Sequence, residues 1–334
     1  MKTKYILALA LSLALVLTLT ACGGRNTASD TQPDAKLSVV ATTFPLYDWT
    51  RQVLGDRAGD VELTLLLDKG VDLHSYQPTV DDLVKVGGAD LFLYVGGESD
   101  EWVEDALKTA ENKDMATLDM LALLGDDARE EEIKEGMEPE DHHHDDEDHD
   151  EDHDEEEHEH EYDEHVWLSL KNARTFVAAI ADELCELDPD HAETYNKNAA
   201  AYDEKLADLD RRYAAAVAAG TKDTLVFGDR FPFLYLAGDY GLDYYAAFVG
   251  CSAESEASFE TVIFLANKVD ALGLGCVMKL EGGDGKLAQT VVENTADKTA
   301  AVLELDSMQS TTSLDDDYLS VMENNLRVLK DALK

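Results

Sequence analysis

Histidines and carboxylates are concentrated in one stretch of this 334-residue chain, and together they indicate metal binding. Eight of the ten histidines lie between positions 141 and 167, in the run DHHHDDEDHDEDHDEEEHEHEYDEHVW. Clustered carboxylates suit hard cations, whereas imidazole nitrogens suit zinc, copper and nickel. The two other histidines are His74 and His191. The candidate sites are therefore a dense acidic tract and a few isolated histidines.

The acidic tract carries much of the formal net charge of −45, because residues 126–164 contain 24 carboxylates against only Arg129 and Lys134. It has no apolar periodicity, and charge repulsion predicts a disordered insert at about 126–163. We expect it to bind divalent ions weakly at several histidines, the alternative being a merely solvated acidic loop. These auxiliary ligands are His142, His143, His144, His149, His153, His158 and His160. A chain this acidic would be repelled by phosphate backbones, so nucleic acid is not an expected partner.

The N-terminus, MKTKYILALALSLALVLTLTACGG, has the pattern of an export signal. Its ending, LTAC, resembles a bacterial lipobox, which predicts a signal peptide at 1–21 and lipid attachment at Cys22. An uncleaved transmembrane anchor is the alternative. The polar stretch 22–36 is expected to be a flexible tether. The protein is thus expected on the outer face of the cell membrane.

Three further cysteines, Cys185, Cys251 and Cys276, are widely spaced and form no C-x-x-C pair. This spacing indicates neither a disulfide framework nor a zinc cage made of cysteines. We expect buried apolar thiols at these positions.

The elements around the histidines alternate between strand and helix, which predicts an α/β fold with parallel sheets. Strands are expected at 37–44 (LSVVATTF) and 61–67 (VELTLLL), with helical spacing at 46–56 between them. A further helix and strand are expected within 81–97, and another helix at 100–113.

Beyond the tract, a long helical region is broken once, at Leu187-Asp188-Pro189-Asp190. Its second part carries a stripe spaced by three and four residues, which must pack along its whole length. The stripe consists of Tyr195, Ala199, Tyr202, Leu206, Leu209, Tyr213 and Val217. After Gly220 the strand-helix alternation resumes and ends in a helix from about Asp315.

The predicted architecture is two α/β lobes joined by one long rigid helix, with a cleft between the lobes that suits a ligand. The expected boundaries are a first lobe at 37–170, which includes the insert, a helical region at 171–219 and a second lobe at 220–334.

The isolated histidines differ in context. His191 follows Pro189 at a polar helix start, where a solvated side chain is expected. His74 lies in GVDLHSYQPT, a loop after an apolar strand, where parallel sheets usually place ligand-binding groups. His165 opens HVWLSLKNA, where the tract ends and ordered sequence is expected to resume.

Five segments, TTFPLYDW, GVDLHSYQPT, ADLFLYVGGESDEWV, EHVWLSLKNA and VLELDSMQS, occur in an order and spacing that resemble the zinc and manganese solute-binding lipoproteins of bacterial ABC transporters. The resemblance covers nearly the whole mature chain. It implies a metal ion held in the cleft by four side chains, with His74 and His165 as two of them and Asp306 as the C-terminal one. In the family, the remaining ligand is a histidine or glutamate at the position of Gly228, which cannot bind a metal.

We expect Asp229 to replace that ligand, while Glu256, a water molecule or a tract histidine are the alternatives. Two imidazoles with one or two carboxylates suit four-coordinate zinc, and an oxygen-richer shell would favour manganese.

The resemblance implies a protein that captures Zn²⁺, or alternatively Mn²⁺, and delivers it to an ABC permease. A surface metal buffer or adhesin without its own transporter is the alternative. An enzyme is not expected, because the chain has no G-x-S-x-G motif, and the spacing of His160 and His165 differs from that of the protease motif H-E-x-x-H.

Overall fold

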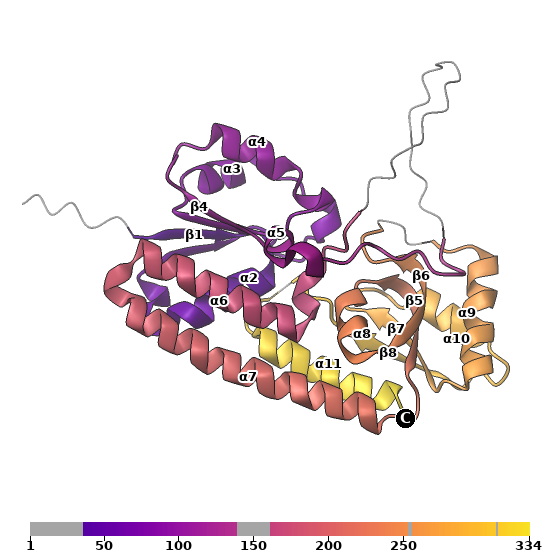
Figure 1. Cartoon of the computed structure of the whole chain (residues 1–334). Coiled ribbons are helices and arrows are strands. Elements are labelled where there is room, and N and C mark those ends of the chain that lie inside the picture. Colours follow the sequence, from indigo (N-terminus) through magenta and orange to yellow (C-terminus); the bar gives the residue numbers. More distant parts are fainter. Residues whose placement is uncertain (1–35, 139–160, 253–255, 312) are drawn as a thin grey trace, which may run out of the picture. The chain divides into compact units, whose positions relative to one another are not determined.

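The computed structural model describes residues 36–138, 161–252, 256–311 and 313–334 (Figure 1). The predicted signal peptide, Cys22 and nearly all of the predicted tether lie outside these residues. So do the auxiliary histidines of the predicted metal-binding loop, which are His142, His143, His144, His149, His153, His158 and His160. Residues 37–334 form one unit.

A parallel four-stranded sheet forms the core of the first lobe. Its strand order is β2-β1-β3-β4, and each neighbouring pair runs parallel. The strands are β1 (Ser38–Ala41), β2 (Glu62–Leu65), β3 (Leu91–Tyr94) and β4 (Ala116–Asp119). The helices of this lobe are α2 (Phe44–Leu54), α3 (Val80–Gly87), α4 (Trp102–Thr109) and α5 (Met120–Leu124).

A second parallel sheet of four strands has the order β6-β5-β7-β8. Its strands are β5 (Thr224–Phe231), β6 (Asp243–Val249), β7 (Cys276–Leu280) and β8 (Ala301–Leu305). The helices that accompany it are α8 (Leu234–Tyr240), α9 (Phe259–Leu272) and α10 (Lys286–Glu293). The expected fold class, α/β with two parallel sheets, is confirmed.

Helix boundaries follow local sequence signals. Pro45 lies in the first turn of α2, and Gly55, with a φ of 54°, ends it. Thr79 and Asp82 form a capping box at the start of α3. Ser169 caps the helix that follows His165 by accepting a hydrogen bond from the Asn172 backbone N–H.

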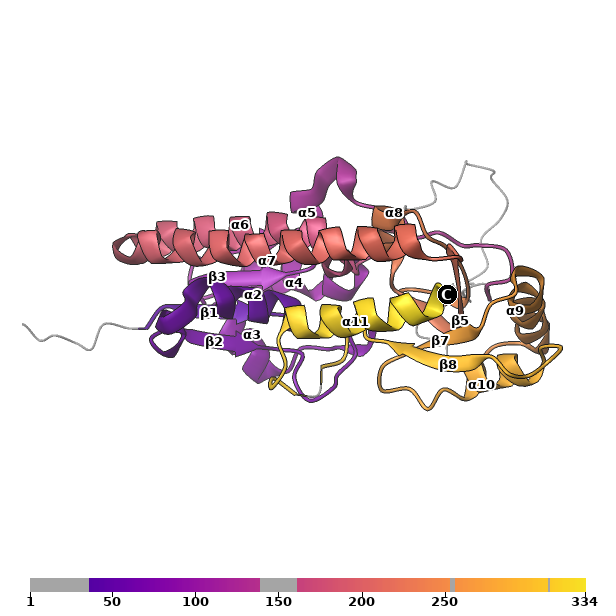
Figure 2. The ribbon, with the colours of Figure 1, turned by 90° about the horizontal axis from the view of Figure 1, so that it is seen from below.

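Three further helices pack together beside the sheets (Figures 1 and 2). They are α6 (Leu170–Leu187), α7 (Ala192–Ala219) and α11 (Tyr318–Ala332). The 28-residue helix α7 packs against α2, which belongs to the first lobe, and against α11, which packs against β8 of the second. The structure thus confirms the predicted long helix, and it breaks the helical region at Asp188 as expected. No helix in the described part of the chain is both long and apolar enough to cross a membrane.

The apolar stripe predicted for α7 is buried, except that Ala216 takes the buried position expected for Val217. Ala216 lies on the buried face, whereas Val217 is only half-buried. The other stripe residues are buried as expected: Tyr195, Ala199, Tyr202, Leu206, Leu209 and Tyr213.

The structure differs from the expectation in two places. The sequence pattern did not indicate strand β4, because this four-residue strand is buried at only one position, Leu118. Residues 126–138 and 161–163, which the prediction assigned to the disordered insert, have defined backbone contacts, and 129–131 pairs with 161–163. Glu131 N donates to Glu161 O, and Asp163 N donates to Arg129 O.

Short 3-10 turns complete the described part of the chain: η1 (Gly55–Gly59), η2 (Leu73–Ser75), η3 (Glu98–Asp100), η4 (Gly125–Asp127), η5 (Val166–Leu168) and η6 (Pro189–His191).

Candidate metal site

His74 lies in the 3-10 turn η2, in the loop that follows strand β2 of the first lobe. Asp72 caps this turn, because its Oδ1 accepts a hydrogen bond of 3.1 Å from the His74 backbone N–H. Leu73 is buried beneath the turn. These contacts hold the His74 side chain, which is only 6% exposed, at the end of the sheet.

His165 is completely buried and stands immediately before the turn η5. The apolar residues that follow it anchor this position, because Val166 and Trp167 are also buried. Trp167 Nε1 donates a 2.7 Å hydrogen bond to the carbonyl of Ser307, close to the end of strand β8. The run HVW therefore fixes the backbone of His165 against the second lobe.

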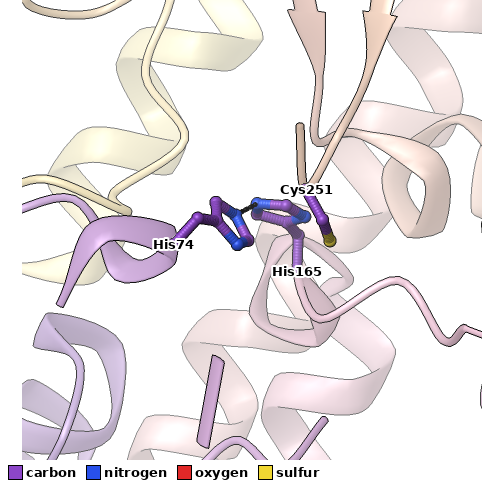
Figure 3. A group of neighbouring side chains, drawn as sticks. All are labelled: His74, His165 and Cys251. Carbon is purple, nitrogen blue, oxygen red and sulfur yellow. Dashed lines mark hydrogen bonds between the residues drawn. The ribbon is translucent and has the colours of Figure 1, made fainter. Parts of the chain in front are cut away.

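The two imidazole rings meet through their Nε2 atoms, which are 3.1 Å apart (Figure 3). Two nitrogen ligands of a tetrahedral zinc ion, with bonds of about 2.0–2.1 Å, would be about 3.3–3.4 Å apart. The observed separation is close to that value. The structure thus brings together the two histidines singled out from the sequence, with the same ring nitrogen of each turned to one point.

The opposite ring nitrogen of each histidine faces polar partners. His74 Nδ1 lies 3.0 Å from Ser99 Oγ and 3.4 Å from Glu164 Oε2. His165 Nδ1 lies 3.3 Å from Asp163 Oδ1. Such partners fix the tautomer and the orientation of a metal-binding histidine. When Nδ1 carries the proton, Nε2 of each ring can offer its lone pair to a cation, which would replace the contact of His165 Nε2 with Gln309 Oε1.

A glycine makes room for Glu164. Gly97 has a φ of 81°, and a Cβ atom built on it would lie 2.5 Å from Glu164 Oε1. The same oxygen accepts a 2.7 Å hydrogen bond from the backbone N–H of Ser99. The sequence VGGES after strand β3 thus folds around this carboxylate.

Burial and the neighbouring polar groups together set the pKa values of these residues. Burial and the neighbouring His165 lower the pKa of His74 to about 3. Burial acts in the same direction on His165, but Asp163 and Gln309 outweigh it and raise the pKa of His165. Burial raises the pKa of Glu164 to about 7. His74 is therefore neutral at physiological pH and can offer a lone pair to a metal ion.

Cys251, expected from the sequence to be a buried apolar thiol, lies beside the histidines. It follows strand β6 of the second lobe, and its sulfur is seen next to the ring of His165 in Figure 3. One ligand atom from each of His74, His165 and Cys251 lies within 4.8 Å of the others. The backbone N–H of Cys251 donates a 2.9 Å hydrogen bond to Glu131 Oε1. Burial and Asp163 raise the thiol pKa well above its ordinary value.

The segment expected to supply the missing ligand makes contacts of its own. A Cβ atom built on Gly228 would lie 2.4 Å from the Ala288 Cα atom, so this position faces helix α10. Asp229 Oδ2 accepts a hydrogen bond from Leu280 N, and its Oδ1 accepts one from Arg230 N. Glu256, the alternative, is exposed. Among the described residues, neither carboxylate joins the group formed by the histidines and Cys251.

Asp306 lies at the end of strand β8, as expected, and its Oδ1 accepts a hydrogen bond from Met308 N. It lines a cavity of about 540 Å³, together with Asp72, Asp229 and Gln309. Gln309 is the residue of this segment that reaches the histidines, with Oε1 2.9 Å from His165 Nε2. The structure therefore places Asp306 beside the candidate site without including it in the histidine group.

His191 lies apart from this group. Its Nδ1 is 2.9 Å from the carboxylate of Asp188 at the break between α6 and α7. The Asp188 contact gives it a local role at the helix start.

Comparisons with known proteins show the family to which the chain belongs. The family model ZnuA, described as "Zinc-uptake complex component A periplasmic", matches residues 39–332. The chain is 34% identical over 317 residues to the zinc-binding lipoprotein AdcA of Streptococcus pneumoniae, with 93% of this chain and 58% of that protein covered. It is 32% identical over 321 residues to the high-affinity zinc uptake system protein ZnuA of Bacillus subtilis, with 94% of this chain and 93% of that protein covered.

A solved structure has the same fold. The crystal structure of the Zn(II)-bound ZnuA-like domain of Streptococcus pneumoniae AdcA has a TM-score of 0.68 and 30% identity to this chain. The similarity covers 90% of this chain and 99% of that domain. The chain thus spans little more than half of AdcA but nearly all of the Bacillus subtilis relative. Because the family model matches nearly the whole described chain, the protein belongs to the ZnuA family of zinc-uptake complex components.

Proposed function

We propose that this protein is the extracytoplasmic metal-binding component of an ABC transporter, capturing zinc and delivering it to the permease. The observation that carries the proposal is the approach of His74 Nε2 and His165 Nε2 to 3.1 Å. Two imidazoles favour zinc over manganese, which prefers oxygen ligands. The relatives named above are described as zinc-binding and zinc-uptake proteins, which supports the same metal. The role is binding and release, without a catalytic residue.

Release follows from where the proposed ligands stand in the chain. His74 belongs to a loop of the first lobe, and Glu164, next to His165, accepts a hydrogen bond from Ser99 of the same lobe, whereas the proposed ligand Asp306 follows strand β8 of the second lobe. Separation of the lobes would pull these ligands apart and open the coordination shell. We expect the permease to favour this open form.

Asp306 and Asp229 remain proposed ligands. Asp306 is the better placed for a role in the loaded form, since it borders the cavity beside Gln309. Asp229 is the weaker candidate, because both of its carboxylate oxygens already accept backbone hydrogen bonds.

Zinc titration of His74→Ala and His165→Ala tests the site. Each substitution removes one nitrogen ligand, so we expect zinc affinity to fall by more than the roughly 10–100-fold that loss of a supporting residue produces. Competition with a chelator of known affinity measures it. His191→Ala is the matched control and should bind as the wild type does. Unchanged affinity in both variants would overturn the site.

The transport role needs its own measurement. Zinc-limited growth and zinc uptake should fail in cells that lack the gene, and His165→Ala should not restore them. Normal uptake in cells without the gene would instead favour a surface metal buffer or adhesin.

We further propose that Cys22 carries a lipid that anchors the protein to the outer face of the cell membrane. The support is the lipobox-like sequence LTAC and the lipoprotein name of AdcA. Cell fractionation of Cys22→Ala tests this, and continued membrane association of the variant would contradict it.

A further inference from the structure

We propose that Cys251 is the third ligand of the bound ion and that its sulfur makes the site prefer zinc to manganese. The inference rests on the proposed metal-binding function and deepens it. It concerns the metal ligand that is missing from this chain because residue 228 is a glycine.

The position of strand β6 places the Cys251 sulfur near the two histidines. Cys251 lies two residues after the end of β6, and the carboxyl ends of parallel strands are where such sheets usually present ligand-binding groups. Gly250 allows a close approach here, because a Cβ atom built on it would lie 3.0 Å from Phe231 O and 3.1 Å from Asp163 Oδ2. The chain therefore turns tightly past Asp163 and brings Cys251 to the ring of His165 (Figure 3).

The distances fit a metal ion after a small side-chain adjustment. In a tetrahedral zinc site with Zn–S of about 2.3 Å and Zn–N of about 2.0–2.1 Å, the sulfur lies about 3.5–3.6 Å from each nitrogen. The three candidate ligand atoms lie within 4.8 Å of one another. A gap of at most about 1.3 Å therefore remains between the sulfur and each nitrogen, which rotation of the cysteine side chain can close.

The charges around the group suit a dication bound by one thiolate. Binding of zinc would displace the Cys251 thiol proton to solvent, and two neutral imidazoles with one thiolate leave the zinc ion with a charge of about +1. Asp163 and Glu164 lie directly behind the histidines and can balance it. The amide oxygen of Gln309, 2.9 Å from His165 Nε2, offers a neutral oxygen on the remaining side.

A sulfur ligand also decides which metal is kept. Thiolates are soft ligands that favour zinc over manganese, whereas carboxylate and carbonyl oxygens suit manganese. Replacing the family's histidine or glutamate with sulfur therefore moves the shell away from manganese.

The absorption spectrum of the protein with cobalt(II) bound in place of zinc shows whether a thiolate is a ligand. Cobalt bound to a thiolate has a near-ultraviolet charge-transfer absorption that cobalt bound only to nitrogen and oxygen lacks. We expect this absorption in the wild type and in Cys185→Ser, a control cysteine near the end of α6, and we expect its loss in Cys251→Ser. Absence of this absorption in the wild type would exclude a thiolate ligand, so the proposal can be overturned even if Cys251→Ser does not fold.

Each outcome has a distinct meaning. Cobalt that binds the wild type without the absorption would overturn the role of Cys251 and leave the histidine site standing. A wild type that binds neither cobalt nor zinc would overturn the proposed function itself. As a second measurement, Cys251→Asp should lower the ratio of zinc affinity to manganese affinity, and an unchanged ratio would contradict the selectivity.

Discussion

At the scale of single residues, two consecutive carboxylates stand behind the two histidines. Asp163 faces His165 Nδ1, and Glu164 faces His74 Nδ1. Glu164 Oε2 is buried and has no hydrogen-bond partner among the described residues, and His74 Nδ1 lies 3.4 Å from it. A buried carboxylate oxygen without a donor is costly, so its place beside an imidazole N–H is informative. We infer that Glu164 orients His74 for the metal.

Changing Glu164→Gln should weaken zinc binding by about 10–100-fold without unfolding the protein, which is typical for residues that support a metal ligand. The burial-raised pKa of Glu164 is about 7. The difference from the wild type should therefore be largest about one unit above that pKa and shrink below it, where the wild-type carboxyl is itself protonated.

Competition titrations at several pH values measure this effect. Glu161→Gln, an exposed carboxylate three residues earlier, is the matched control and should follow the wild-type curve. A Glu164→Gln variant with wild-type affinity throughout would contradict the orienting role.

Single residues also show where sequence reasoning stops. His74 and His165 could be chosen because each stands in a distinctive segment. Cys251 could not, because its neighbours along the chain carry no ligand pattern and its proximity arises only from the position of β6 in the sheet. The family resemblance placed a ligand at position 228. In this chain Gly228 packs on Ala288, so a side chain at that position would face helix α10.

At the scale of elements, periodicity was sufficient wherever a segment buries one face. The stripe of α7 is the example, because burial imposes its spacing, whereas β1 and β3 were recognised as continuous apolar runs, since three consecutive residues are buried in each. Strand β4 failed this test because only one of its residues is buried. The segment 128–138 failed it because polar contacts hold it. Lys134 pairs with Asp243, and Glu138 N donates to Ala247 O on the second lobe.

Replacing residues 139–160 with a short glycine-serine linker tests the proposed auxiliary loop at this scale. We expect fewer zinc ions bound per protein but one tight ion retained, because the residues of the histidine group lie outside the replaced segment. Metal analysis after equilibrium dialysis measures the number.

The matched control keeps the acidic residues and changes only the loop histidines to asparagine. If imidazole binds the extra ions, this variant should resemble the linker variant. Loss of the tight ion in either protein would mean that the tract itself forms the primary site.

At the scale of the whole unit, polar contacts join the two lobes next to the candidate site. Arg230, at the end of β5, donates a 2.8 Å hydrogen bond to Asp72, whose other oxygen holds the turn of His74. Nearby, Gly70 N donates to Thr311 O. The Asp72–Arg230 ion pair therefore links the second lobe to the turn that carries the proposed ligand His74, and we expect it to favour the closed form.

Arg230→Ala should make zinc dissociate about five-fold faster, since an ion pair of this kind contributes about 1 kcal/mol. Stopped-flow release into a chelator measures the rate. The difference should shrink at high salt, which screens the wild-type pair. Arg174→Ala removes a similar pair with Asp203 within the helical region and should leave the rate unchanged. Equal rates in the wild type and Arg230→Ala would contradict a role in closure.

Pairing of residues 129–131 with 161–163 holds the chain in place directly before His165, so the acidic tract joins the chain close to the candidate site, which affects how quickly that site can refill with zinc. Residue 160 is five positions before His165 in the chain. Even fully stretched, the backbone between them spans at most about 18 Å. An ion held at His160 would meet the histidine pair at an effective concentration in the millimolar range. We therefore expect that zinc captured by the tract can reload an emptied site by a local transfer, so that the dilute metal outside the cell would no longer limit the rate of each cycle.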